Sequence, residues 1–246
     1  MERKSINNAF YDSLKEGWFN RVDHPVALLR AENRLRNPWI QEVIQQEFAR
    51  KVSILDIGCG AGFLTHDLAV SGHEVHGIDL SSESLYWAQA KDTTGSVHYK
   101  QGTAYDLPYQ RESFDVVLAM DLLEHVEDPK RVCMEAGRVL KKNGLFFFHT
   151  FNRTLLSYLL VIKGVELCVS NTPKNMHVYS LFIKPSEMQS MCGEAGMKVD
   201  KIHGVRPIFI QKALWKMVFT RKVEEDFAFR FTPSLQTGYS GFARKC

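Results

Sequence analysis

The chain has 246 residues, of which 45% are hydrophobic, so it is long and apolar enough to bury a sizeable core in one domain. Its net charge of +3 is too mild for the concentrated basic face of a nucleic-acid-binding protein, and nucleic acid is therefore not an expected partner. No segment reaches the roughly 18 consecutive apolar residues that a membrane-spanning helix needs. The opening sequence "MERKSINNAF" has neither a signal nor a transit character, and five scattered cysteines fit no disulfide frame or zinc site, so we expect a cytoplasmic protein.

The first fifty residues are expected to be helical. Residues 6–20 put Phe10, Tyr11, Leu14, Trp18 and Phe19 on one helical stripe, and residues 26–49 continue with a helical pattern. We therefore expect a helical N-terminal lid over residues 1–50.

Strand and helix patterns alternate from residue 51 to residue 151. Short apolar runs predict strands at 51–58, 73–80, 97–104, 114–121 and 144–151. Helical patterns separate them at 62–71, 82–92 and 127–141. This rhythm is typical of βαβ units and predicts an α/β fold with a mostly parallel sheet covered by helices on both faces.

The rhythm breaks between residues 152 and 184. An apolar segment, "LLSYLLVIKGVELCV" (155–169), is followed there by a polar loop, and residues 185–246 return to helix and then to strands that complete the sheet. We expect a single domain over residues 1–246 with an apolar insertion at about 152–184.

The turn "LDIGCGAGFL" (55–64) joins the first predicted strand to the next helix. Gly58, Gly60 and Gly62 allow a tight turn and close approach of a ligand. Asp56 precedes them at the strand end, where a carboxylate can meet an ammonium group. The glycine spacing is G-x-G-x-G and not the G-x-G-x-x-G of a pyrophosphate cradle. Asp79 ends the second strand, where an acid binds both ribose hydroxyls of an adenosine. A ligand with an ammonium group, an adenosine and no phosphates fits better than NAD.

These motifs, "LDIGCGAG", "GIDLS" and "GTAYDLP", resemble those of class I methyltransferases that use S-adenosyl-L-methionine. Four further segments, "LLRAENRLRNPWI", "AMDLLEHVEDP", "FHTFNR" and "HVYSLFIKPSEM", resemble the ubiquinone-biosynthesis O-methyltransferase family. The resemblance implies a Rossmann-like, mostly parallel seven-stranded sheet and methylation of a phenolic hydroxyl of polyprenyl-catechol and demethylubiquinol intermediates. It runs from about Phe10 to Met188 and fades after Gly204, where "QKALWKMVFTRKVEEDFAFRF" departs from the family's ending.

The resemblance also implies cofactor contacts. They fall on Arg36, Gly58, Asp79 and Met120, with Arg36 meeting the methionyl carboxylate from the lid. Thr103 stands where many relatives carry an acid for the adenine amine, so its backbone and that of Ala104 are expected to take that role.

Asp121, Glu124 and His125 in "DLLEHVEDP" would share one face of a helix that begins there. Spacing alone favours a capping aspartate, a solvated glutamate and a core histidine. The family has a metal triad of the form acid-x-x-Glu-His, which this chain keeps, so the resemblance implies a divalent cation such as Mg²⁺ or Zn²⁺ that lowers the pKa of the phenol. Alternatively, His125 is a general base without a metal, and His177 is a weaker candidate with a structural role.

The apolar segment 155–169 is too short to span a bilayer. Arg153, Lys163, Lys174 and Lys184 flank it with positive charge, which suits an anionic membrane interface, and the resemblance implies the same membrane contact. An ordinary buried helix is the rival interpretation.

The sequence thus predicts an O-methyltransferase in the cytoplasm, peripherally associated with the inner face of the membrane. Its substrate is a polyprenylated catechol or quinol, and other quinone-biosynthesis proteins are further expected partners. One rival is an O-methyltransferase of another small phenol. A second is a non-catalytic cofactor-binding subunit of a quinone-synthesis complex, although a mere binder needs no acid/histidine triad.

Overall fold

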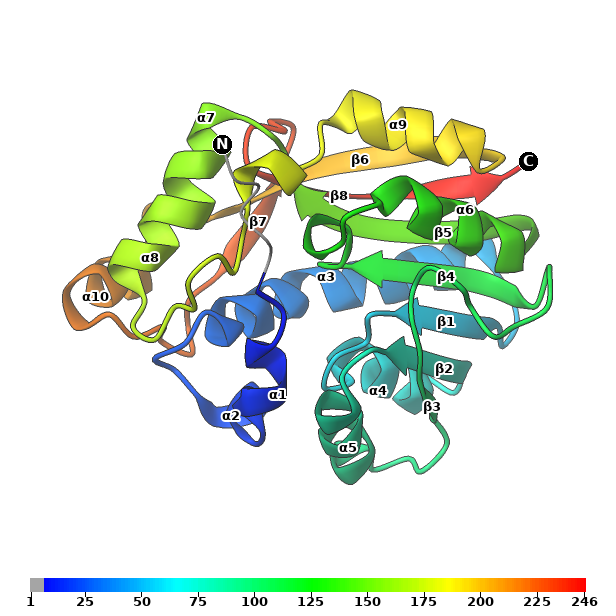
Figure 1. Cartoon of the computed structure of the whole chain (residues 1–246), viewed down its shortest axis with the longest axis horizontal. Coiled ribbons are helices and arrows are strands. Elements are labelled where there is room, and N and C mark those ends of the chain that lie inside the picture. The colour runs from blue at the N-terminus through cyan, green and yellow to red at the C-terminus, as the bar shows by residue number, and fades with distance from the viewer. Residues whose placement is uncertain (1–6) are drawn as a thin grey trace.

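The computed structural model describes residues 7–246, and an eight-stranded sheet runs through its centre (Figure 1). The strand order is β3-β2-β1-β4-β5-β8-β6-β7. The strands are β1 (Ser53–Ile57), β2 (Glu74–Asp79), β3 (His98–Gln101), β4 (Phe114–Met120), β5 (Leu140–Phe151), β6 (Met197–Pro207), β7 (Phe229–Thr232) and β8 (Gly238–Lys245). Strands β1 to β5 pair in parallel, whereas β8 is antiparallel to both β5 and β6. The sheet has one strand more than expected, because β7 pairs antiparallel with β6 at the edge.

Helices cover both faces of the sheet. The longer ones are α3 (Val26–Glu47), α4 (Phe63–Val70), α5 (Ser82–Lys91), α6 (Pro129–Val139), α9 (Pro185–Glu194) and α10 (Lys212–Thr220). Apolar side chains of α6 and α9 form one core cluster with the strands, and those of α3 and α4 form another with different strand residues. The predicted α/β fold with two covered faces is therefore confirmed.

The N-terminal segment folds differently from the single helix that its aromatic stripe predicts. It forms two short helices, α1 (Phe10–Leu14) and α2 (Gly17–Asn20), because Lys15 adopts a left-handed φ of 49° that ends α1. The stripe still packs as one cluster: Leu14 and Trp18 are buried against Ala61 of the glycine turn. The predicted lid residues 1–6 lie outside the described part of the chain.

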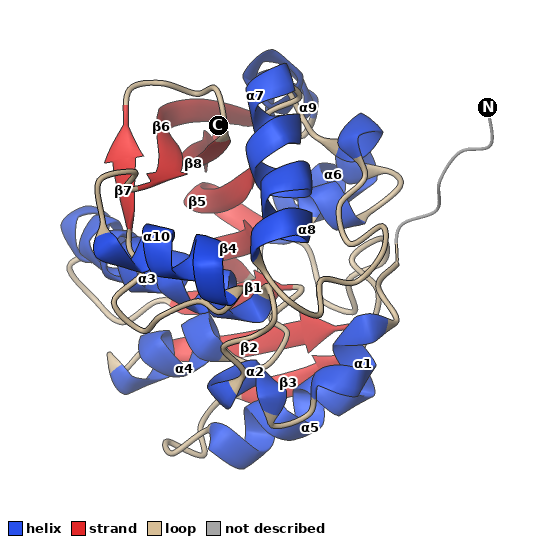
Figure 2. Cartoon of the chain, turned by 90° about the vertical axis from the view of Figure 1, so that its left-hand side faces the viewer, coloured by secondary structure: helices blue, strands red, loops and turns tan. Residues whose placement is uncertain are grey.

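The insertion is one helical rod built from α7 (Leu155–Ser157), the π-helix η2 (Tyr158–Gly164) and α8 (Val165–Cys168). It stands beside α10 at the left-hand end of the molecule in Figure 1, the side that faces the viewer in Figure 2. Two single turns, η1 (Leu123–His125) and η3 (Tyr179–Leu181), complete the helical elements. Within residues 7–246 no helix is long and apolar enough to cross a bilayer.

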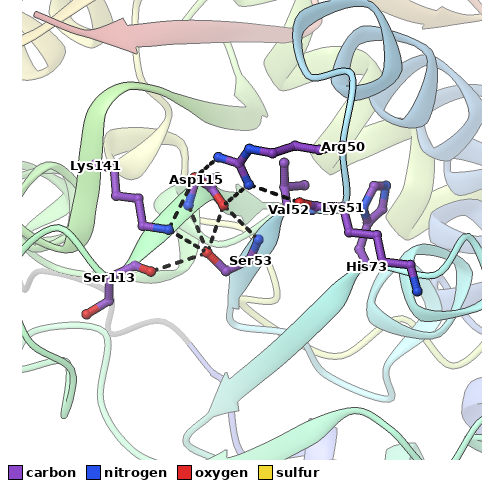
Figure 3. A network of polar contacts seen from close by, with 8 residues as sticks. All are labelled: Arg50, Lys51, Val52, Ser53, His73, Ser113, Asp115 and Lys141. Carbon is purple, nitrogen blue, oxygen red and sulfur yellow. Dashed lines mark hydrogen bonds and ion pairs between the residues drawn. The ribbon is translucent and has the colours of Figure 1, made fainter.

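The amino ends of β1 and β4 are tied together by a polar network around Asp115 (Figure 3). Its carboxylate accepts hydrogen bonds from the Ser53 amide (2.9 Å), from Arg50 (2.8 Å) and from Lys141 (3.2 Å). Arg50 lowers the pKa of Asp115 against the opposing effect of burial. This network fixes the edge of the sheet opposite the carboxyl ends, where ligands bind in such folds.

Candidate active site

A cavity of about 520 Å³ lies at the carboxyl ends of β1, β2 and β4. Most of the residues predicted to bind the cofactor line it: Asp56, Gly58, Gly60, Asp79, Thr103, Ala104 and Met120. We call it the cofactor cavity. The parallel pairing of β1 with β2 puts Asp56 and Asp79 at the same edge of the sheet, because Ile57 pairs with Ile78. Two acids far apart in the sequence therefore meet in one site.

The glycine turn wraps tightly under the lid. The backbone of Gly60 is left-handed at φ 53°, and a Cβ there would lie only 3.3 Å from the Trp18 ring, so both its conformation and its surroundings favour glycine. The Gly58 amide donates to the carbonyl of Ile78 (2.7 Å), and the Gly60 amide donates to the Asp79 carboxylate (2.8 Å). The turn is thereby fixed to the end of β2.

Acidic side chains are concentrated around the cofactor cavity. Burial, followed by the charges of Asp79 and Asp121, raises the pKa of Asp56 to about 8. Burial also raises the pKa of Asp79, although amides of Ser81 and Gly60 donate to its carboxylate and oppose that shift. A cationic ligand would relieve the repulsion between these acids. The cavity therefore suits a sulfonium and an ammonium group.

Arg36 lies one step behind the wall of this cavity. Its side chain is fully buried, and its guanidinium donates to both carboxylate oxygens of Asp121 (2.7 Å to Oδ1) and to Asn33 Oδ1 (2.9 Å). Asn33 and Asn37 of the same helix line the cavity, whereas Arg36 is not among the described lining residues. Direct contact between Arg36 and a methionyl carboxylate would require the pair with Asp121 to open.

The prediction that Asp121, Glu124 and His125 share one face of an α-helix is wrong. Only a single 3-10 turn, η1, forms there, and Asp121 precedes it with a left-handed φ of 55°. Asp121 caps no helix; α6 is instead capped by Asp128, whose side chain accepts from the Arg131 amide (3.0 Å). The Asp121 carboxylate instead accepts a hydrogen bond from Arg36 of α3 (2.7 Å).

Within residues 7–246, the side chains whose ligand atoms lie within 4.8 Å of one another are Glu32, Asp121 and His149, and not the predicted triad. The Arg36 guanidinium already supplies the positive charge there, 3.4 Å from Glu32 and paired with Asp121. The cluster of Glu32, Asp121 and His149 therefore does not fit a metal ion.

Glu124 and His125 are buried, and some of their polar atoms form no hydrogen bond to the described residues. Both carboxylate oxygens of Glu124 and Nδ1 of His125 have no hydrogen-bond partner among the described residues. Burial, followed by the charge of Asp121, raises the pKa of Glu124 to about 8, whereas burial lowers that of His125 to about 4. A neutral imidazole and a carboxyl group without partners have the chemistry of metal ligands or of a proton acceptor, but the ligand atoms of Asp121, Glu124 and His125 do not all lie within 4.8 Å of one another.

An apolar cavity of about 390 Å³ adjoins the cofactor cavity. One face of the insertion rod lines it, through Leu160, Val161, Gly164, Val165 and Cys168. The two cavities share Tyr11, Trp18, Leu29, Asp121 and His125. A group bound in one cavity can therefore face a group bound in the other across His125.

Several residues of this junction were not predicted as functional. Tyr11 and Trp18 were interpreted only as packing residues, yet their rings stack at 5.5 Å, and the Tyr11 hydroxyl lies 3.5 Å from Nε2 of His125. His177, the weaker candidate, lines the apolar cavity with its ring 5.2 Å from that of His125. Aromatic residues in a segment that folds over a glycine turn are the signal that could have found the first two.

Comparison with known proteins agrees with this geometry. A family model described as a methyltransferase domain matches residues 55–148, which span the glycine turn and β5 up to Phe148. The fold is similar to that of magnesium protoporphyrin IX methyltransferase from Synechocystis with bound SAH, with a TM-score of 0.61, 15% identity and coverage of 99% of this chain and 90% of the other.

Sequence relatives are more specific. The chain is 36% identical over 214 residues to a ubiquinone biosynthesis O-methyltransferase of Actinobacillus pleuropneumoniae, covering 83% of this chain and 89% of the relative. It is 36% identical over 200 residues to the protein of that name from Pseudomonas syringae pv. tomato, covering 80% and 84%. Such identity over most of both lengths, joined to the acids and glycines of the cofactor cavity, means that this chain is an S-adenosylmethionine-dependent methyltransferase and belongs to the ubiquinone biosynthesis O-methyltransferase family.

Proposed function

We propose that the protein transfers the methyl group of S-adenosyl-L-methionine to a phenolic hydroxyl of a polyprenylated catechol or demethylubiquinol. The observation that carries the proposal is the meeting of the polar cofactor cavity with the apolar cavity at Asp121 and His125. A charged donor suits the first cavity and an aromatic ring with an isoprenoid tail suits the second. The methyl group and the hydroxyl then meet at their junction.

In this assignment the cofactor is held by the residues at the strand ends. Asp79 accepts hydrogen bonds from the ribose hydroxyls, Asp56 faces the ammonium group, and the turn at Gly58 and Gly60 lies against the cofactor. Met120, Thr103 and Ala104 bound the adenosine side. Lining of the same cavity by all these residues supports the assignment.

The reaction is a direct displacement. The phenolic oxygen bonds to the methyl carbon while the carbon–sulfur bond breaks and its electron pair stays on sulfur, so the main tasks are alignment and removal of the phenolic proton. Burial lowers the pKa of His125 to about 4, so the imidazole is neutral but weakly basic in the free protein, and the charge of Asp121 opposes that shift. Its Nδ1 lacks a partner among the described residues, which leaves that atom free to accept the phenolic proton.

Asp121, Glu124 and His125 would hold a divalent cation, Mg²⁺ or Zn²⁺. When bound, such an ion lowers the pKa of a phenol and orients its oxygen. The unpartnered oxygens of Glu124 support this set, and binding would displace the proton that its raised pKa retains near neutrality. Asp121 would have to turn away from Arg36 to join it.

We further propose that the protein works at the inner face of the cytoplasmic membrane, close to other quinone-biosynthesis proteins. Leu155, Leu156, Leu159 and Leu167 of the insertion rod are exposed to between 44% and 73%, which supports membrane contact of its outer face. A rod whose inner face lines a cavity and whose outer face is apolar differs from an ordinary core helix.

The decisive experiment is a methylation assay with a radiolabelled donor. Catechol and demethylquinol analogues carrying short prenyl tails should be methylated at the hydroxyl, and His125→Ala should abolish the activity. Methylation of soluble phenols without a tail, at equal or higher kcat/KM, would instead indicate an enzyme for another small phenol. Cofactor binding without turnover on any acceptor would indicate a non-catalytic subunit.

A further inference from the structure

Helix α10 has apolar side chains on both of its faces. Ala213 and Met217 point inward and are buried in a cluster with α3 and the loop after α8. Trp215 and Phe219, one turn apart on the outer face, are exposed to 60% and 82%, and Ile210 just before the helix is exposed to 96%. Burial of one face explains why the helix forms. It does not explain the second apolar face, which among the described residues has no cover.

This outer face is continuous with the apolar cavity. Trp215, Val218 and Phe209 line the cavity and are exposed to 60%, 41% and 39%, so the cavity reaches the surface between α10 and the insertion rod. The α8 part of the insertion rod packs beside α10 and carries the exposed Leu167, and Figure 2 shows the rod and α10 on the same side of the molecule.

The charged residues of α10 and its immediate flanks are of one sign. The segment 206–222 contains Arg206, Lys212, Lys216, Arg221 and Lys222 and no acidic residue. Lys216 pairs with Glu224 of the acidic run that follows, at 3.6 Å, whereas Lys212 and Lys222 form no ion pair with any residue of the described range 7–246. Exposed Trp and Phe beside free cations are the composition of a segment that lies in an anionic lipid interface.

We propose that α10, together with the preceding Phe209–Ile210 turn, docks on an anionic phospholipid bilayer beside the insertion rod, and that the polyprenyl tail enters the apolar cavity from the bilayer between the two. The docking surface is defined by Ile210, Trp215 and Phe219, with Leu167 of the adjacent α8. This inference rests on the proposed function for the identity of the tail, but not for the docking itself. It also gives a role to the C-terminal segment that departs from the resemblance.

The test uses the double variant Ile210→Ser/Phe219→Ser, because these two side chains are exposed and neither lines a cavity. The matched control is Val70→Ser/Tyr86→Ser, which removes two apolar side chains that are each 62% exposed, on α4 and α5. Wild type and control should sediment with vesicles of phosphatidylglycerol and phosphatidylcholine, more weakly at high salt and with phosphatidylcholine alone. The test variant should partition at least about tenfold more weakly, with an unchanged melting temperature.

A methylation assay on two quinols should also distinguish the test variant from the wild type. The test variant should match wild type on a soluble short-tailed quinol and lose most of its rate on a long-tailed quinol embedded in vesicles. Wild-type sedimentation without methylation of either quinol would defeat the proposed substrate and leave the docking intact. Vesicle binding that the test variant retains would overturn the docking by α10. A wild-type dimer that becomes monomeric in the test variant, with no vesicle binding by either, would identify a second copy as the cover.

Discussion

Affinity for S-adenosyl-L-methionine should depend strongly on pH, because Asp56 is protonated in the free protein at neutrality. Burial and the neighbouring charges of Asp79 and Asp121 raise its pKa to about 8. A carboxylate that faces an ammonium group has to be ionised, so binding lowers the pKa of Asp56 and releases a proton. The affinity is then complete above the pKa of the free protein and is lost as the pH falls below it.

The size of the effect follows from that pKa. Below pH 8 each pH unit should weaken binding about tenfold, equivalent to about 1.36 kcal/mol, as long as one proton is released. Titration calorimetry between about pH 5 and pH 6.5, where an α-amino group stays more than about 90% protonated, avoids titration of the ligand itself. Repeating the titration in buffers of different ionisation enthalpy counts the protons directly.

Two variants identify the group responsible. Asp56→Asn should bind weakly at every pH and with almost no slope. Glu124→Gln should keep the wild-type slope, although burial also raises the pKa of Glu124 to about 8, because Glu124 does not line the cofactor cavity. A flat wild-type profile, or an undiminished slope in Asp56→Asn, would refute the assignment of Asp56 to the ammonium group.

Three further results are expected. Asp79→Ala should weaken cofactor binding in calorimetry by roughly 1.5–3 kcal/mol for each charge-assisted hydrogen bond lost, with NAD silent in the wild type, and undiminished binding would remove the ribose assignment. Glu124→Gln and His125→Ala should reduce turnover by orders of magnitude while cofactor affinity stays nearly intact. In the wild type a chelator should reduce turnover as these substitutions do, and added Mg²⁺ or Zn²⁺ should restore it. If His125→Ala is inactive but the chelator has no effect on the wild type, His125 acts as a base without a metal. Asp115→Asn should lower the free energy of unfolding in urea by about 1–3 kcal/mol near pH 7, because the pKa of its carboxylate is lowered in the folded state. This contribution is complete above the unfolded pKa, shrinks as the pH falls below that value and disappears only below the folded pKa, so a loss that is no smaller at about pH 2.5 than at about pH 7 would contradict it.

The pattern of strands and helices could be predicted from local sequence over the central part of the chain. Runs such as 114–121 and 144–151 correspond to β4 and β5, because a strand buried on both faces is recognisable from its continuous apolar residues. The strand β7 could not be predicted in this way. It has only four residues, and it forms because β6 offers an unpaired edge at that point.

The candidate site divides in a similar way. Asp56 and Asp79 could be assigned because each ends a strand, and parallel strands bring their carboxyl ends to one edge. The stripe of Phe10, Tyr11 and Trp18 could be recognised as a packing face. That Tyr11 and Trp18 line both cavities could not be predicted, because it depends on which residues lie opposite them in the folded protein.

The sequence by itself determined the fold, the cofactor edge and the family, since these depend on periodicity, on glycines at a turn and on acids at strand ends. The direction of the Asp121 side chain was decided only in the tertiary structure. Its helical spacing to Glu124 and His125 is a local pattern, but its carboxylate pairs with Arg36, which is 85 positions away in the chain. Leaving a buried guanidinium without its carboxylate partner would cost several kcal/mol of stability. The helix propensity of a few residues contributes less than that, so the ion pair decides the direction of the Asp121 side chain.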